Sequence, residues 1–279
     1  MTQIERAGYA TLSKAIGSRR ADWLADLYRD GVRTPAEAVA YRLSARGRRS
    51  RHQLEELRDQ YTGNRCFIIG NGPSLSDTDL APLRDEYTFG LNRGYLLFER
   101  IGGATTFLVA VNRYVVEQFG AELLAVPTVK FVSWRARSYL PERQDVILVR
   151  RSRPRTFSSN VATNGAWEGA TVTYVAMQLA FHLGFQRVIL IGVDHSFATT
   201  GTPNKLITAT ASDLNHFDPN YFGPGVRWEL PDLKMSEVAY QLAREHFEAH
   251  GREIVDATVG GKLTVFPKVD YESVLQNAE

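Results

Sequence analysis

Short apolar runs alternate with helical patterns of hydrophobic residues through residues 63–279. Seven runs predict strands, at residues 66–69, 88–91, 106–111, 128–133, 146–149, 188–192 and 253–256. Several of these runs are apolar throughout, as expected of parallel strands that are covered on both faces. The pattern therefore predicts an α/β fold, a Rossmann-like and mainly parallel sheet with helices on both faces.

The clearest unit of this pattern spans residues 171–194. Apolar residues recur at helical spacing and stop at Gly184, a typical helix-ending glycine. The run 188–192 follows as a strand, and Asp194 and His195 come directly after it. Because open α/β sheets bind ligands beyond the carboxyl ends of their strands, this pair is a candidate for the functional site. Helix capping or a loop hydrogen bond is the competing explanation.

The chain before this domain is predicted to be helical. Leu24, Leu27 and Tyr28 have helical spacing, and Thr34-Pro-Ala-Glu37 resembles a capping box with proline at the first helical position. We therefore predict an N-terminal helical extension over residues 1–62 and a Rossmann-like domain over residues 63–279.

The most informative segment follows the first predicted strand. The strand is broken at once by Gly70, Asn71, Gly72 and Pro73. Glycine and asparagine tolerate positive φ, so the turn can be tight and its amides can converge. Ser74 or Ser76 can cap the helix that follows. The spacing is neither a dinucleotide motif nor a P-loop, but such a turn is where an open α/β sheet holds a nucleotide. An ordinary strand-to-helix turn has the same composition.

Polar residues also follow the next two predicted strands. Asn92 and Arg93 follow the second run, and Asn112 and Arg113 repeat the pair after the third. A carboxamide can hydrogen-bond a base or a ribose, and arginine can reach a phosphate. Asparagine in a plain turn explains Asn92 equally well, but the repetition favours a binding site at this edge.

Residues 196–232 are predicted to form a long loop. They are polar, rich in Asn, Pro and Gly, and without a regular pattern. A loop of this length inside a domain is often a lid or a binding loop. His216 lies in it, and no apolar periodicity requires a histidine there. His216 is therefore a candidate general base.

The distribution of charge is more informative than its sum. The net charge of +2 is too small to indicate nucleic-acid binding. Residues 135–155 contain seven arginines and two acids, which suits an anionic donor or acceptor, or else a solvated loop. Asp77 and Asp79 have the spacing of a metal-binding pair, but acids are common at helix starts, so we predict no metal site.

The first 60 residues carry the basic excess, with 12 Lys+Arg against 8 Asp+Glu. The tract 42–51 is a candidate contact with an anionic membrane surface or an acidic partner, unless it is a solvated helix end. No apolar run reaches the ~18 residues of a membrane span, and the N-terminus lacks the apolar core of a signal peptide. Cys66, the single cysteine, is predicted to be a core thiol. We therefore expect a cytoplasmic protein, with the inner face of the membrane as an alternative location.

Four motifs, taken in order, resemble two related bacterial groups. They are Ile-Ile-Gly-Asn-Gly-Pro-Ser-Leu75, Leu-Asn-Arg-Gly94, the segment from Gly169 to His195, and His216-Phe. They are similar to the family 42 sialyltransferases, and also to the flagellin-modifying motility accessory factors and 6-hydroxymethylpterin diphosphokinase-like proteins. The resemblance covers residues 64–257 and leaves the first 60 residues unexplained.

The resemblance to the sialyltransferases implies roles for the residues that bind the donor. It places Asn71, Gly72 and Ser74 on the nucleotide, with Asn92 beside them. It also places the helix N-terminus at Thr171-Val-Thr173 on the donor phosphate, although the Ser-Gly of the family pattern is absent here.

The same resemblance implies catalytic roles in the late part of the chain. Asp194 matches the acid that ends the strand, and His216 matches the neighbourhood of the general-base histidine. The tyrosine pair that those enzymes direct at the phosphate has no clear counterpart, and Tyr221 is a substitute candidate. Apart from the resemblance, His195 is the next candidate for the base, since it also follows a predicted strand.

The function implied is that of a glycosyltransferase of cell-surface glycan synthesis. It would take a nucleotide-sugar donor and a glycan acceptor, need no cofactor, and work by displacement at the anomeric carbon. Two alternatives stay open. A pterin diphosphokinase would transfer diphosphate from ATP and would need Mg²⁺, whereas a non-catalytic nucleotide-binding module would turn over no substrate.

Overall fold

The computed structural model describes residues 34–152 and 155–276, so the expected helix around Leu24 lies outside the described residues. The chain divides into two units, Met1–Arg48 and Arg49–Glu279. The divide falls inside helix α4 (Ala45–Leu57). The residues after Arg48 therefore group with the larger unit, whereas the sequence pattern placed the boundary at residue 62.

The described part of the smaller unit is helical, as the sequence predicts. Helix α3 (Thr34–Leu43) begins at the expected capping box, with Glu37 in its first turn. The Ser44 hydroxyl accepts a hydrogen bond from Gly47 N at 3.0 Å, where α4 begins.

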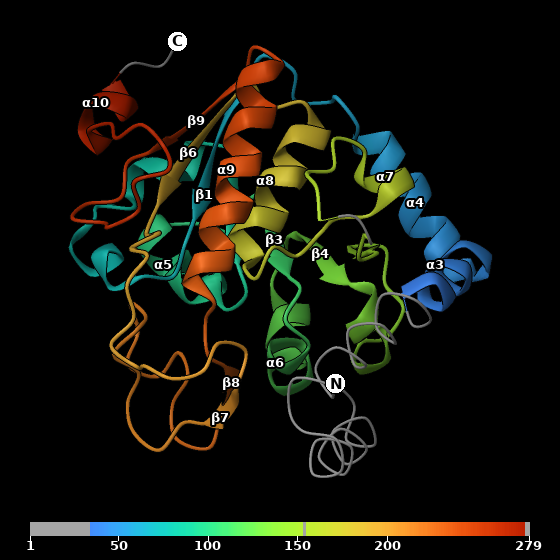
Figure 1. Ribbon diagram of the computed structural model, residues 1–279, viewed down its shortest axis with the longest axis horizontal. Coiled ribbons are helices and arrows are strands. Elements are labelled where there is room, and N and C mark those ends of the chain that lie inside the picture. Colours follow the sequence, from blue (N-terminus) through green and yellow to red (C-terminus); the bar gives the residue numbers. More distant parts are fainter. Residues whose placement is uncertain (1–33, 153–154, 277–279) are drawn as a thin grey trace. The chain divides into compact units, whose positions relative to one another are not determined.

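A seven-stranded parallel sheet forms the centre of the larger unit (Figure 1). Its strand order is β5-β4-β3-β2-β1-β6-β9. The strands are β1 (Arg65–Ile69), β2 (Thr88–Leu91), β3 (Phe107–Ala110), β4 (Val129–Ser133), β5 (Val146–Val149), β6 (Arg187–Ile191) and β9 (Glu253–Asp256). All seven expected strands are present, and the predicted α/β fold is confirmed.

Helices and short 3₁₀ segments connect the strands and cover the sheet. The α-helices are α5 (Phe98–Ile101), α6 (Arg113–Ala125), α7 (Val161–Asn164), α8 (Val172–Leu183), α9 (Leu233–Ala249) and α10 (Tyr271–Gln276). The 3₁₀ helices are η2 (Pro73–Asp77), η3 (Ala81–Asp85), η4 (Gly94–Leu97) and η5 (Trp134–Tyr139). Helix α8 ends at Gly184 with φ 100°, as its sequence predicts.

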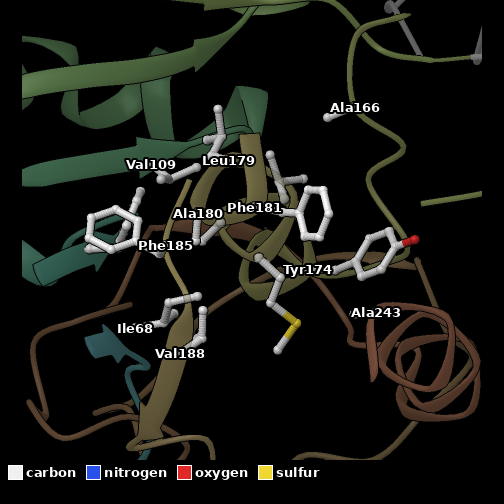
Figure 2. Packing of buried hydrophobic residues seen from close by; sticks show 14 of the residues in the cluster. Ile68, Val109, Ala166, Tyr174, Leu179, Ala180, Phe181, Phe185, Val188 and Ala243 are labelled. Atoms are coloured by element: carbon white, nitrogen blue, oxygen red, sulfur yellow. The ribbon is translucent and has the colours of Figure 1, made fainter. Parts of the chain in front are cut away.

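One face of the sheet packs against α8 and α9, which lie side by side in Figure 1. The strands contribute alternate residues to this core, among them Ile68 and Val188, because successive side chains of a strand point to opposite faces. Figure 2 shows these two side chains near Ala180 of α8. Cys66 belongs to the same cluster and is a buried free thiol, as expected.

The other face of the sheet packs against shorter elements. The alternate positions of β1 and β6 are taken by Phe67, Ile69 and Ile191. They belong to a cluster with residues of η2, η3, η4, α5 and α10. Both faces are therefore covered, which explains why the strands appear in the sequence as continuous apolar runs.

Residues 196–232 contain structure that the sequence analysis did not predict. Strands β7 (Leu206–Thr208) and β8 (Arg227–Glu229) pair antiparallel in a sheet of their own. A separate hydrophobic cluster lies beneath them, with Tyr221, Phe222 and Trp228 buried against Val115 of α6. The expectation of a loop without regular structure is therefore wrong, because aromatic packing fixes a segment whose strands are too short to form a recognisable pattern.

Among the described helices, none combines the length and the apolar content that a bilayer span requires.

Candidate functional site

The order of the strands creates a switch point between β1 and β6. From β1 the chain proceeds outward through β2 to β5, and it then places β6 and β9 on the other side of β1. Connections therefore leave β1 and β6 in opposite directions, and open α/β sheets bind ligands beyond the carboxyl ends of such a pair. The glycine turn, defined as residues 70–74, and Asp194 follow these two strands.

Four hydrogen bonds fix the glycine turn to the end of β6. Gly70 and Gly72 donate their amides to main-chain oxygens of residues 191 and 192, at 2.7 and 2.9 Å. Ser74 donates twice to Asp194, from N to Oδ1 at 3.0 Å and from the hydroxyl to Oδ2 at 2.7 Å. Asp194 thus uses both carboxylate oxygens to hold the turn.

The backbone of the turn differs from the expectation of positive φ. Gly72 is extended, with φ −71° and ψ 160°, and all five residues of the turn are described and have negative φ. Glycine is required for close approach instead, since a Cβ on Gly72 would lie less than 3.0 Å from the Asp194 carboxylate. The helix that follows is the short η2 with Gly72 at its N-cap, so neither Ser74 nor Ser76 caps it.

Two asparagines at the ends of β1 and β2 each leave a buried side-chain oxygen unpaired. Asn71 donates Nδ2 to Leu91 O at 3.1 Å, but its Oδ1 accepts no hydrogen bond from the described residues. Asn92 Oδ1 likewise accepts no hydrogen bond from the described residues. The backbone of Asn92 has a φ of 51°, which is uncommon for a residue with a side chain. A buried acceptor without a partner costs about 1–3 kcal/mol, so both oxygens suit an N–H or O–H group of a ligand.

Two other residues predicted at this edge bind the protein itself. Asn112 Oδ1 accepts from Tyr114 N at 2.9 Å and caps α6. Arg93 is buried, and its guanidinium donates to Asn220 O at 2.9 Å and to Tyr221 O. The Arg93 side chain therefore points into the protein, whereas the sequence analysis expected it to reach a phosphate.

The N-terminus of α8 opens at the same edge, because α8 leads into β6 of a parallel sheet. Thr171 caps the helix by accepting from Thr173 N at 3.2 Å. Gly169 and Ala170 precede it in the left-handed region, with φ of 55° and 63°. The first-turn amides and the helix dipole favour an anion here. The Thr171 hydroxyl also lies 3.4 Å from the phenol oxygen of Tyr240 on α9.

His216 is oriented by a buried carboxylate that the sequence analysis missed. Its Nδ1 lies 2.7 Å from Asp213 Oδ2, and the Asp213 side chain is only 2% exposed. An ionised carboxylate only accepts hydrogen bonds, so Nδ1 carries a proton, and in the neutral imidazole Nε2 is the nitrogen that keeps a lone pair. The imidazole stacks on Tyr221, with ring centroids 4.1 Å apart and an angle of 11° between the planes.

The environment of Asp213 keeps its carboxylate charged. Burial alone would raise the pKa of Asp213, but the hydrogen bond and charge of His216 lower it, as do the amides of Asn215 and Phe222. The net result is an Asp213 pKa below its ordinary value. The negative charge therefore supports a positive charge on His216 after it accepts a proton, which is the arrangement of a general base.

The loop that carries His216 is attached to the glycine turn. Phe217 N donates to Asn71 O at 3.0 Å, and the Ser76 hydroxyl donates to Phe217 O at 3.4 Å. The structure thus brings together His216 and Asn71, which the sequence assigned to one site. This part of residues 196–232 is anchored to the sheet and is not a free lid.

Tyr221 and His195 lie beside this arrangement. Tyr221 is fully buried, and its phenol oxygen accepts from Arg93 N at 3.2 Å, so it supports His216 from beneath and does not face a ligand. His195 has a φ of 53°, and its Nε2 lies 2.9 Å from Glu237 Oε1 of α9. His195 is therefore held toward α9, on the β6 side of the switch point.

The arginine-rich segment does not form one cluster. Arg143 pairs with Asp145, Arg150 donates to the main-chain oxygens of residues 163 and 164, and Arg151 lies 3.8 Å from Glu168. Arg153 lies outside the described residues. Arg137 donates to Trp134 O at 3.0 Å, so at least four of the seven arginines bind protein groups. A shared anion site over this segment stays a prediction.

Sequence reasoning missed Asp213, Glu237 and Tyr240. Asp213 could have been found from the sequence, because it precedes His216 by three residues in the predicted binding loop 196–232. Glu237 and Tyr240 belong to the amphipathic helix α9, and only the fold brings them to the site. Within the described ranges, no three His, Cys, Asp or Glu side chains gather in a group that could hold a metal ion.

Comparisons with known proteins give one similar structure. No protein-family model matches the chain, and no curated protein matches it. A sialyltransferase structure, CstII from Campylobacter jejuni in complex with the substrate analogue cytidine-5'-monophosphate, is 15% identical with a TM-score of 0.45. The match covers 75% of this chain and 85% of that chain. Similarity at this level identifies neither the donor nor the acceptor of the present protein.

Proposed function

We propose that this protein is a transferase that binds a nucleotide-activated sugar at the carboxyl edge of its sheet and moves the sugar to a glycan acceptor. The observation that carries the proposal is the Asp213–His216 pair. It holds an imidazole in one orientation on a loop whose next residue, Phe217, is hydrogen-bonded to the glycine turn. A base held in one tautomer beside a nucleotide-binding edge is the minimum that such a transfer needs.

Two features support a nucleotide donor. The unpaired oxygens of Asn71 and Asn92 are acceptors, which suit the amino or hydroxyl groups of a nucleoside. The N-terminus of α8, capped by Thr171, suits the phosphate. The sequence resemblance to the family 42 sialyltransferases assigns the same residues to the donor.

In the proposed reaction the acceptor hydroxyl attacks the anomeric carbon of the donor sugar. His216 Nε2 takes the hydroxyl proton while the new C–O bond forms. The bond from the anomeric carbon to the phosphate oxygen breaks, and its electrons leave with the nucleotide phosphate. The α8 N-terminus stabilises the charge on that leaving group, and Asp213 stabilises the imidazolium.

A thermal-shift screen against CMP, UDP, GDP and ATP, with and without Mg²⁺, tests donor binding. A ligand at 100 times its Kd stabilises the folded protein by about 2.7 kcal/mol, which raises Tm by several degrees. We expect stabilisation by a pyrimidine or guanine nucleotide without Mg²⁺, and less of it in Asn92→Ala. Stabilisation by ATP only with Mg²⁺ would favour the diphosphokinase, and no stabilisation by any nucleotide would refute the proposal.

A further inference from the structure

Arg93 joins the end of β2 to the loop that carries His216. It directly follows Asn92, yet it is only 8% exposed. Its guanidinium stacks on Phe119 of α6 at 3.9 Å from the ring centroid and donates to the main-chain oxygens of residues 220 and 221. Its Nε donates to the phenol oxygen of Tyr95 at 3.2 Å. A planar, fully engaged guanidinium of this kind fixes its partners in both distance and orientation.

The contacts of Arg93 converge on the ring beneath His216. Arg93 N donates to the Tyr221 phenol oxygen at 3.2 Å, and the guanidinium holds the Tyr221 main chain. Tyr221 is thus fixed at both ends, and the imidazole of His216 lies flat against its ring. Asp213 sets the direction of Nδ1 in the imidazole plane, while Tyr221 sets the plane itself.

We propose that Arg93 is a positioning residue that sets the plane of the His216 imidazole through Tyr221. This inference rests on the proposed function, since it assumes that His216 is the base. It also links the two halves of the site, because Asn92 and Arg93 are adjacent. A ligand that holds Asn92 therefore steadies the segment on which Tyr221 is fixed.

The test compares Arg93→Lys and Arg93→Ala with Arg252→Lys. Arg252 is a matched control, since it also stacks on a ring, Phe181 at 4.2 Å, and donates to a main-chain oxygen at 2.8 Å. It directly precedes β9 and therefore lies at the amino edge of the sheet, opposite to the carboxyl edge. We expect both Arg93 variants to lower turnover about 10–100-fold, the scale of a small misplacement of a reacting group, with nucleotide Kd within about threefold. Added guanidinium should restore part of the turnover of Arg93→Ala, which a loss of folding stability alone would not allow.

Equal losses of turnover and nucleotide affinity, or equal effects of Arg93→Lys and Arg252→Lys, would overturn the inference. A wild-type protein without turnover would refute the proposed function. The positioning role of Arg93 would then be tested by a measurement that does not depend on activity. That measurement is the imidazole ¹⁵N and ring-proton spectrum of His216. We expect Arg93→Lys to shift these signals and Arg252→Lys to leave them unchanged. Unchanged signals in Arg93→Lys would refute the positioning role.

Discussion

A methyl group added at Gly72 tests how the glycine turn is held. The backbone of Gly72, with φ −71° and ψ 160°, is open to any residue, so Gly72→Ala introduces no backbone strain. The added Cβ would instead overlap the Asp194 carboxylate and lie 2.9 Å from Gly192 O. The carboxylate can move away only by giving up its hydrogen bonds to Ser74, at 3.0 and 2.7 Å.

The cost follows from those two bonds. Hydrogen bonds to a charged group contribute about 1.5–3 kcal/mol each, and water near the half-buried Asp194 replaces part of the loss. We therefore expect Gly72→Ala to destabilise the protein by about 2–4 kcal/mol, or about 8 °C in Tm. Chemical denaturation at pH 7 gives the free energy of unfolding, and a nucleotide titration reports on the displaced turn.

A double-mutant cycle separates this explanation from a general packing defect. In an Asp194→Ala background the overlapping carboxylate is gone, so adding Gly72→Ala should cost less than about 0.5–1 kcal/mol. The reasoning is refuted if the two substitutions are additive, because the methyl group would then be clashing with something other than Asp194.

Three further predictions concern charge and burial. Asp145→Ala leaves the ammonium of Lys130, 1% exposed, without its carboxylate at 2.8 Å, and should cost about 3 kcal/mol in urea denaturation at pH 7. Burial alone would raise the Asp145 pKa, but hydrogen bonds from Arg143 and Lys130 lower it to about 2, so the wild-type advantage should shrink steadily as pH falls from 4 toward 2 and be lost below that; an advantage that is as large at pH 2 as at pH 7 would be inconsistent with this pairing. The Asp213 pKa is also lowered, so the stability that Asp213 contributes is present above about pH 4 and lost below it, and the Tm of Asp213→Asn should be lower at pH 7 and less sensitive to acid. Burial raises the pKa of the Cys66 thiol, so alkylation should be undetectable in the folded protein and rapid in denaturant, and fast labelling of the native state would contradict its place in the core.

The sheet could be predicted from sequence because its strands are buried on both faces. Residues 88–91, 146–149 and 253–256 were expected as strands with the bounds that the structure has. Buried parallel strands appear as unbroken apolar runs, so the sequence marks where they begin and end. Strands β7 and β8 were missed because each has three residues and depends on aromatic packing to distant parts of the chain.

The site could be predicted only in part. The topology rule placed Asn71 and Asn92 near one edge, and the family resemblance added His216; the hydrogen bond from Phe217 to Asn71 agrees with that placement. The direction of individual side chains could not be predicted. Arg93 points into the protein because Phe119 and the main chain around Tyr221 offer it a ring and two carbonyl groups, and those partners become neighbours only in the folded chain.

The most direct test of the central claim is the rate at which nucleotide is released from a panel of nucleotide sugars in the presence of glycan acceptors, compared between the wild type and His216→Ala. The account predicts that one donor is consumed by the wild type without added metal. It predicts a release rate about 10²–10⁴-fold lower in His216→Ala, with donor affinity within a few fold, because only the proton acceptor is lost. Equal release rates in the two proteins, or no consumption of any donor by the wild type, would contradict it.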